Sequence, residues 1–370
     1  MIQITFIYEI IIYNVGEEKK MKKLFIPIIS LLALGSLVGC GNKSESTISS
    51  SEGSSTAESS EESSSETVVD YSDLKIACPS GAPALALYDM YDSSNVEINA
   101  SADNVASYLA PNSEKDIVIA PTNLVVSKVI KGGAPFKLAG VITFGNFYIA
   151  ATGNDDNETF DKDDYIVLFQ TTGLPGKLFN YTYGTDYTNI HSVDAASNAA
   201  RCLITGINES DSNASVDYVL VPQPALTPAL QNAKTTRSAV ADKIKVVKNV
   251  QEDYYAKAGN NPITQASIFV KATDDHNKRV KIGSFLYDVS KKLEAIKANQ
   301  DDLDAKLGSL ENTQLQAKFG APNLTILKKV VKENSVNIGY EVGIDFKPSV
   351  DSFLKNLGFT SEDTSEELYW

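Results

Sequence analysis

From Val68 onward, short apolar runs alternate with amphipathic stretches, which predicts a chain of alternating strands and helices. The run Asp116–Ala120 is apolar almost throughout, as is typical of a strand buried on both faces of a parallel sheet. Between Val280 and Ile296, apolar residues recur at steps of three and four, which predicts a long helix. The residues that this helix is expected to bury are Val280, Ile282, Phe285, Leu286, Val289, Leu293 and Ile296. Thr273 is expected to cap this helix, with aspartates in its first turn.

The same patterns predict the remaining elements of an α/β protein. The predicted strands are Leu74–Ala77, Val96–Ala100, Asp116–Ala120, Phe136–Phe144, Phe147–Ala151, Tyr165–Phe169, Ile190–Val193, Val216–Val221, Ile244–Val247 and Ser267–Lys271. The other predicted helices are Ala84–Tyr91, Val105–Leu109, Leu124–Ile130, Leu174–Tyr181, Ala195–Ile204, a helix ending at Gln231, Leu324–Lys332 and Ser349–Leu357.

The order of these elements predicts two α/β lobes, because the strand–helix theme is interrupted and then repeated. Residues 70–146 and 272–370 are expected to form lobe 1, and residues 147–271 lobe 2. Two crossing strands, near Phe144–Ala151 and Ile268–Lys271, would act as the hinge. Since ligands of open α/β sheets bind outside the carboxyl ends of the strands, a cleft between the two sheets is the expected ligand site.

Ahead of the predicted lobes, two lysines precede an apolar stretch, Leu24–Val38, that ends at Cys40. A basic start, a short apolar run and a small residue at the cleavage point are the parts of a secretory signal. The alternative, an unprocessed membrane anchor, is disfavoured because a spanning helix needs about 20 apolar residues. The run resembles a bacterial lipobox, which implies that residues 21–40 are a lipoprotein signal peptide and that Cys40 is lipidated.

Two further segments flank this signal. Residues 1–20 carry no targeting pattern, and we interpret them as a mis-called start ahead of Met21. Residues 41–69 are rich in Ser and Glu and nearly free of apolar residues, which predicts a disordered tether. The expected location is therefore the extracytoplasmic face of a cell membrane, on the surface of a Gram-positive cell.

Composition narrows the classes of function. The formal net charge is −14, from 47 acidic and 33 basic residues. Nucleic-acid binding needs clusters of Lys and Arg that the sequence lacks, so we expect no nucleic-acid partner. Neither a metal-ligand spacing nor a G-x-S-x-G turn is present, so we expect no metal, no cofactor and no enzyme activity. Cys78 and Cys202 could pair or remain two buried free thiols, and we favour free thiols.

Three segments carry a resemblance to a known family. Asp116–Asn123 and Lys131–Val141 resemble the extracytoplasmic solute-binding proteins of ABC importers, in the nitrate, sulfonate, taurine and thiamine-precursor branch. Asp217–Pro224 is similar to a lobe 2 strand of that branch, which ends in an acidic or amide residue before proline. The resemblance covers most of residues 74–360. It implies a two-lobed periplasmic-binding-protein-like fold of type II, a small-molecule solute, a permease in the membrane and a monomeric protein.

The candidate ligand contacts lie at strand ends and at the hinge, where free amides and hydroxyls suit a polar group. They are Ser80, Gly81, Ala82, Thr122, Asn123, Gly145, Asn146, Thr171, Thr172, Gly173, Tyr183 and Gln223. Tyr183 or Phe144 would stack on a ring of the solute, and Gln223 would hydrogen-bond across the closed cleft. At any single position the alternative is a plain cap or turn. These turns lack Lys and Arg, which counts against a bare sulfonate or nitrate and leaves a neutral or heterocyclic solute open.

The predicted function is a lipid-anchored protein that traps a small polar or heterocyclic solute between two lobes and delivers it to an ABC permease. Two alternatives stay open. One is an adhesin or sensor lipoprotein that binds no solute. The other is a pyrimidine-precursor synthase-like enzyme on the same fold, for which His191 is the single histidine near lobe 2.

Overall fold

The computed structural model describes residues 69–359 and 365–370, all of which belong to one compact unit, residues 66–370. The predictions for residues 1–20, for the signal peptide and its Cys40, and for the tether up to residue 68 lie outside the described residues. Among the helices that are described, none is both long and apolar enough to cross a bilayer.

The first sheet contains strands from both ends of the described chain, in the order β13-β4-β12-β3-β1-β2. Its strands are β1 Ile76–Pro79, β2 Val96–Asn99, β3 Ile117–Pro121, β4 Phe136–Thr143, β12 Ala266–Lys271 and β13 Ile338–Val342. β1 runs parallel to β2 and β3, whereas β12 is antiparallel to β3 and β4. β3 is buried from Ile117 to Ala120, as its continuous apolar run predicts.

The second sheet is formed by the middle of the chain, in the order β11-β5-β10-β6-β7. Its strands are β5 Phe147–Ala151, β6 Ile166–Phe169, β7 Ile190–Val193, β10 Tyr218–Pro222 and β11 Lys245–Asn249. β6 runs parallel to β7 and β10, and β5 is antiparallel to β10 and β11. A short hairpin, β8 Ile207–Asn208 and β9 Ala214–Ser215, lies outside this sheet.

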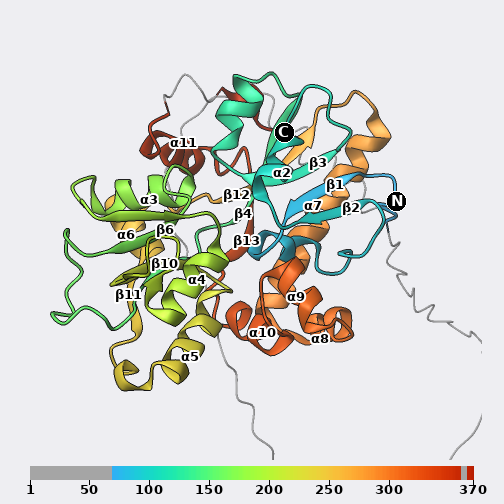
Figure 1. Cartoon of the computed structure of the whole chain (residues 1–370). Coiled ribbons are helices and arrows are strands. Elements are labelled where there is room, and N and C mark those ends of the chain that lie inside the picture. Colours follow the sequence, from blue (N-terminus) through green and yellow to red (C-terminus); the bar gives the residue numbers. More distant parts are fainter. Residues whose placement is uncertain (1–68, 360–364) are drawn as a thin grey trace, which may run out of the picture. The chain divides into compact units, whose positions relative to one another are not determined.

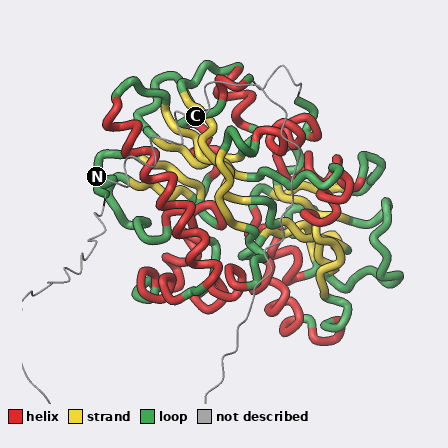
Figure 2. The backbone as a smooth tube through the Cα atoms, turned by 180° about the vertical axis from the view of Figure 1, so that it is seen from behind, coloured by secondary structure: helices red, strands yellow, loops and turns green. Residues whose placement is uncertain are grey.

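Helices surround the two groups of strands (Figure 2). The α-helices are α2 Ala102–Ser107, α3 Leu174–Tyr183, α4 Ala196–Thr205, α5 Leu226–Thr236, α6 Val250–Lys257, α7 His276–Ala298, α8 Asp301–Leu307, α9 Asn312–Phe319, α10 Leu324–Lys332 and α11 Lys347–Asn356. The remaining helical segments are η1 Ala82–Leu87, η2 Val125–Ile130, η3 Ser238–Val240 and η5 Glu366–Leu368.

The chain passes from the first sheet to the second and back, as the colours of Figure 1 show. The outward crossing lies between Thr143 and Phe147, and the return crossing lies in segment 258–265, after α6. Residues 266–271 form β12 of the first sheet, so the predicted lobe 2 limit at residue 271 and the crossing at Ile268–Lys271 are corrected. An apolar run of this kind does not reveal which of two sheets the strand joins.

Helix α7 confirms most of its predicted pattern. Its predicted core residues Ile282, Phe285, Leu286, Val289, Leu293 and Ile296 are buried. The prediction that Val280 is buried is wrong. Val280 is 56% exposed, because a residue two positions before Ile282 lies on the opposite side of a helix with 3.6 residues per turn. Asp275, not Thr273, is the cap: its side chain accepts hydrogen bonds from the amides of Asn277 and Lys278.

The two sheets share part of their hydrophobic core. One cluster of buried side chains includes Phe269 of the first sheet, Tyr218 of the second and Phe353 of α11. Tyr254 of α6 packs edge-on against Phe353 and receives a hydrogen bond from Asn356 Nδ2 at 3.0 Å. The halves are therefore packed against each other through apolar and polar contacts.

Candidate functional site

The parallel strands of both sheets end at the turns that carry most of the predicted contacts. In the first sheet, β1 ends before Ser80 and β3 ends before Thr122. In the second sheet, β6 ends before Gln170 and β10 ends before Gln223. Ligands of α/β sheets bind outside such carboxyl ends, so these turns frame the candidate site.

Four segments at the crossings are joined by hydrogen bonds into one group. The Thr122 amide donates to Gln265 O at 3.0 Å, and the Gln265 amide donates to Thr143 O at 2.9 Å. The Gln223 amide donates to Asn146 O at 2.9 Å, and Asn146 Nδ2 donates to Gln223 O at 2.5 Å. We call residues 121–123, 143–146, 222–224 and 263–266 the crossing cluster.

Buried polar atoms without a partner gather in the crossing cluster. Five side-chain oxygens there are inaccessible to solvent and have no hydrogen-bond partner within residues 69–359 and 365–370: Asn123 Oδ1, Thr143 Oγ1, Asn146 Oδ1, Thr264 Oγ1 and Gln265 Oε1. An unsatisfied buried polar group costs about 1–3 kcal/mol, and native proteins keep few of them. Their concentration on three neighbouring segments marks this place as the candidate binding site.

Loops that follow strands of the two sheets come close together beside the crossing cluster. A Cβ atom built on Gly320, after α9, would lie 3.4 Å from Gly81 Cα and 3.5 Å from Pro224 Cγ. Gly81 follows β1 of the first sheet, and Pro224 follows β10 of the second. Tyr148 of β5 adds a hydrogen bond to Ser335 O at 3.0 Å, after α10. The described structure therefore holds the two halves together on this side.

Several turn amides that we expected to be free are bonded within the protein. The Ser80 amide donates to Asn99 O at 2.8 Å, and the Gly81 amide donates to Lys318 O at 3.1 Å. The Gly173 amide donates to Gln170 O at 2.8 Å. The expectation of free amides is therefore wrong at these positions and at Thr122. The accepting carbonyls come from β2, α9, the return crossing and the lobe 2 turn itself, and the sequence pattern does not reveal these contacts.

Two predicted side chains are also bonded locally. Thr122 Oγ1 shares a 2.7 Å hydrogen bond with Ser267 Oγ inside the first sheet. Gln223 Nε2 donates to Thr227 Oγ1 at 2.9 Å, and Gln223 Oε1 accepts from the Thr227 amide at 3.3 Å. In this conformation Gln223 caps the start of α5 rather than reaching across the site.

Gly145 occupies its predicted place between the two sheets. Its φ of 95° lies in the region that glycine tolerates and other residues avoid. A Cβ at this position would lie 2.6 Å from Gln251 Cγ. Gln251, which the sequence did not single out, accepts a hydrogen bond from the Phe147 amide at 2.6 Å. The outward crossing thus fits closely around a glycine.

The lobe 2 turn that contains Thr171 and Thr172 follows β6. Thr172 is exposed, and the Thr171 amide lies 3.4 Å from Ser192 Oγ. Gln170, just before it, has a φ of 55°, which is uncommon for a residue other than glycine and is often found at functional sites. This turn contributes a hydroxyl that remains open to solvent.

Tyr183 is not brought to the site. It lies at the end of α3, ten residues from Gly173, and its hydroxyl donates to Asp253 Oδ2 at 2.7 Å. Its ring lies 5.6 Å from that of Phe160 and 5.2 Å from that of Phe179. Burial and the Asp253 carboxylate raise the pKa of Tyr183 above its usual range. The alternative ring, Phe144, packs edge-on against Phe346 at 5.8 Å.

His191 has a local structural environment. Its ring stacks on Tyr165 at 3.7 Å, and its nitrogens lie 2.7 Å from Asn189 Oδ1 and 3.3 Å from Asp211 Oδ2.

Cys78 and Cys202 are buried free thiols, which confirms the prediction that they do not pair. Within residues 69–359 and 365–370, no group of three or more His, Cys, Asp or Glu side chains is arranged to hold a metal ion.

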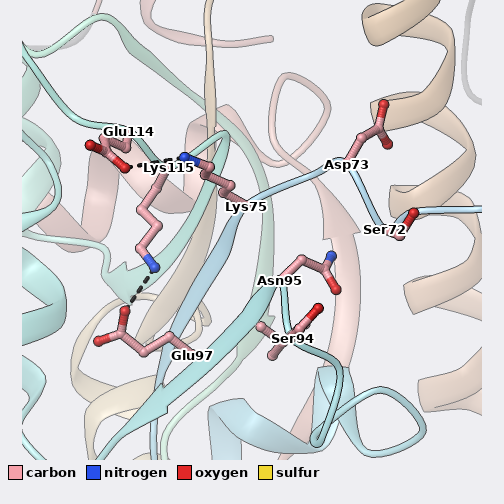
Figure 3. A pocket seen from close by; sticks show the side chains of 9 residues that line it. Ser72, Asp73, Lys75, Ser94, Asn95, Glu97, Glu114 and Lys115 are labelled. Carbon is pink, nitrogen blue, oxygen red and sulfur yellow. Dashed lines mark hydrogen bonds and ion pairs between the residues drawn. The ribbon is translucent and has the colours of Figure 1, made fainter.

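A separate depression of about 500 Å³ lies at the amino ends of β1 and β2 (Figure 3). Its charged side chains are all paired: Lys75 with Glu114 at 3.1 Å, Lys115 with Glu97 at 2.7 Å, and Asp73 with Lys281, outside the depression, at 2.7 Å. This depression is at the other end of the parallel strands from the crossing cluster, and its charges are already neutralised by pairing.

Comparisons with known proteins find solved structures with a similar fold. No protein-family model matches the sequence, and no curated protein matches it significantly. A solved ABC transporter structure from Parabacteroides distasonis is similar with a TM-score of 0.56 at 18% identity, over 77% of this chain and 91% of that chain. The ligand-binding component of an ABC-type import system from Staphylococcus aureus, solved with zinc bound, is similar with a TM-score of 0.52 at 12% identity. This match covers 80% of this chain and 97% of that chain.

At such identities the likeness shows the fold alone. The mixed α/β architecture with two sheets agrees with these structures, and it confirms the predicted periplasmic-binding-protein-like fold. The chain therefore has the fold of ABC-transporter solute-binding proteins.

Proposed function

We propose that this chain is a lipid-anchored solute-binding protein of an ABC importer. It captures a small polar or heterocyclic solute between its two sheets and delivers it to a permease in the membrane. Lipidated Cys40 holds it at the extracytoplasmic face of a Gram-positive cell, and it acts as a monomer. The fold shared with components of ABC transporters supports a small-molecule ligand and a permease partner.

The crossing cluster carries this proposal. Its unpaired oxygens come from the ends of β3 and β4 and from the two crossings, near Gly320, which lies close to both Gly81 and Pro224. A solute that paired with these oxygens would compensate their desolvation only while the halves are closed. Differential binding of this kind shifts an open–closed equilibrium toward the closed form, which is the form a permease can distinguish.

Isothermal titration of the full chain with a broad panel of small solutes tests the proposal. We expect one solute class to bind, and we expect Asn123→Leu to weaken that binding by about tenfold, the equivalent of about 1.4 kcal/mol. The control is Asn198→Leu, at an exposed position of α4. Absence of binding from the whole panel would contradict solute capture.

A second function, a sensor or adhesin lipoprotein without a solute, is favoured by one observation. The side chains of Thr122 and Gln223 and several turn amides are bonded within the protein, so part of the site is occupied by the protein's own groups. The same titration separates the two functions, because a sensor of this kind binds a protein partner and gives no heat with small solutes.

A further inference from the structure

The turns around the crossing cluster carry no charged side chain. They comprise residues 80–82, 121–123, 143–146, 170–173, 222–224 and 263–266, and none of these is Asp, Glu, Lys, Arg or His. A charged solute enclosed here would lose its hydration without meeting an opposite charge, which is strongly unfavourable in a buried site.

Several backbone hydrogen-bond donors at these turns are already used within the protein. The amides of Ser80, Gly81, Thr122, Gly173 and Gln223 all donate to carbonyl oxygens of the protein. Proline, which has no N–H, occupies the first turn of both η1 and α3 and position 224 ahead of α5. The helix starts near the site therefore lack several of the amides with which such starts bind anions.

Several hydrogen-bond acceptors of the crossing cluster, by contrast, have no partner among the described residues. The unpaired atoms include three amide oxygens, Asn123 Oδ1, Asn146 Oδ1 and Gln265 Oε1, which can only accept hydrogen bonds. Asn146 Nδ2 donates to Gln223 O, so the unpaired atom of that side-chain amide is its oxygen, Oδ1. The hydroxyls of Thr143 and Thr264 are fully buried and can accept or donate.

We infer that the solute is an uncharged molecule that offers several N–H or O–H groups, and not an anion such as a sulfonate, nitrate or phosphonate. This inference rests on the proposed function and names the chemical class of its ligand. The solute donates to the amide oxygens of the crossing cluster and pairs with the hydroxyls of Thr143 and Thr264. Its lack of charge matches the lack of charged side chains in these turns.

Thermal-shift measurements and titration of the full chain with two sets of solutes test the class. The uncharged set contains urea, nicotinamide, uracil, cytosine, glucose and myo-inositol, and the charged set contains nitrate, ethanesulfonate, methylphosphonate and putrescine. We expect binding only within the uncharged set. Binding of a charged compound overturns the inference and leaves the proposed function standing, whereas no binding in either set overturns both.

A double variant, Thr143→Val with Thr264→Val, tests the location. It removes two buried hydroxyls without changing shape, so we expect a folded protein whose affinity for the bound solute falls at least tenfold. The matched control is Thr182→Val in α3, which removes another buried, unpaired hydroxyl outside the crossing cluster and leaves affinity unchanged. Wild-type affinity in the double variant overturns the inference even though a solute binds.

Discussion

Asn146 extends the pairing of β5 and β10 in the second sheet through a buried side-chain hydrogen bond. Its side chain is 4% exposed and donates to Gln223 O at 2.5 Å. Asn146→Ala leaves that carbonyl without its side-chain donor, so we expect the free energy of unfolding to fall by about 1–3 kcal/mol. Urea unfolding followed by circular dichroism measures the change. Asn198→Ala, on the exposed face of α4, is the control, and equal effects of the two substitutions would contradict the role of Asn146.

Asp217 makes the stability depend on pH. Burial raises the pKa of its carboxyl, although the Tyr165 amide donates to it at 2.9 Å. The folded state therefore holds this proton at a higher pH than the unfolded state does, and the contribution of Asp217 to stability rises as the pH falls from neutral toward that pKa. Asp217→Asn keeps an oxygen for Tyr165 and removes the charge.

We expect this variant to be more stable at pH 7 by under about 1 kcal/mol, since solvent screens a partly exposed group. Lowering the pH from 7 to 5 should also raise the free energy of unfolding of the variant by less than it raises that of the wild type. Urea unfolding at both pH values measures the difference. The same pH dependence in both proteins would show that Asp217 is not responsible.

At single residues, the sequence predicted part of the candidate site. Asn123 lies in the turn after β3 and Asn146 lies at the crossing between β4 and β5, and these positions mark them as candidates. Thr143, Thr264 and Gln265 were missed, because each lies beside a strand end whose partners come from distant parts of the chain. Tyr183 does not lie at the turn, because it is the last residue of α3, ten residues from Gly173, and its hydroxyl bonds Asp253.

At the scale of elements, α7 offers a matched pair of substitutions. Val289 is 2% exposed against the first sheet's core, whereas Val280 is 56% exposed on the other side of the helix. Val289→Ala should lower the free energy of unfolding by about 2 kcal/mol through lost burial and a cavity. Val280→Ala should change it by less than about 0.5 kcal/mol. Thermal and urea unfolding of both variants measure these changes. Equal losses of stability in the two variants would contradict this placement of the helix.

Long apolar elements were predictable, and short polar ones were not. β3, β5 and α7 have continuous or periodic apolar residues, so their type and position followed from pattern alone. β13 was missed because it contains a glycine and is only partly buried. α9 was missed although Glu311 and Gln314 form a capping box, which is a recognisable start signal. The return crossing was misplaced because sheet membership depends on tertiary contacts.

At the scale of the whole molecule, closure of the two halves depends on a narrow contact at Gly320. Its φ of 71° means that any side chain costs about 1–2 kcal/mol in backbone strain. Gly320→Ala and Gly320→Leu both carry this strain, but only leucine is large enough to push against Pro224 and Gly81. We expect the leucine variant to bind solute at least tenfold more weakly than the alanine variant in titrations. Equal affinities would contradict closure at this contact.

Native mass spectrometry of the full chain, purified gently from cells, tests the central claim most directly. The account predicts a population carrying one small, uncharged molecule, which is released when the protein is unfolded and which rebinds to the emptied protein. A chain that carries no small molecule, and takes up none from a cell extract of metabolites, would contradict solute capture between the two sheets.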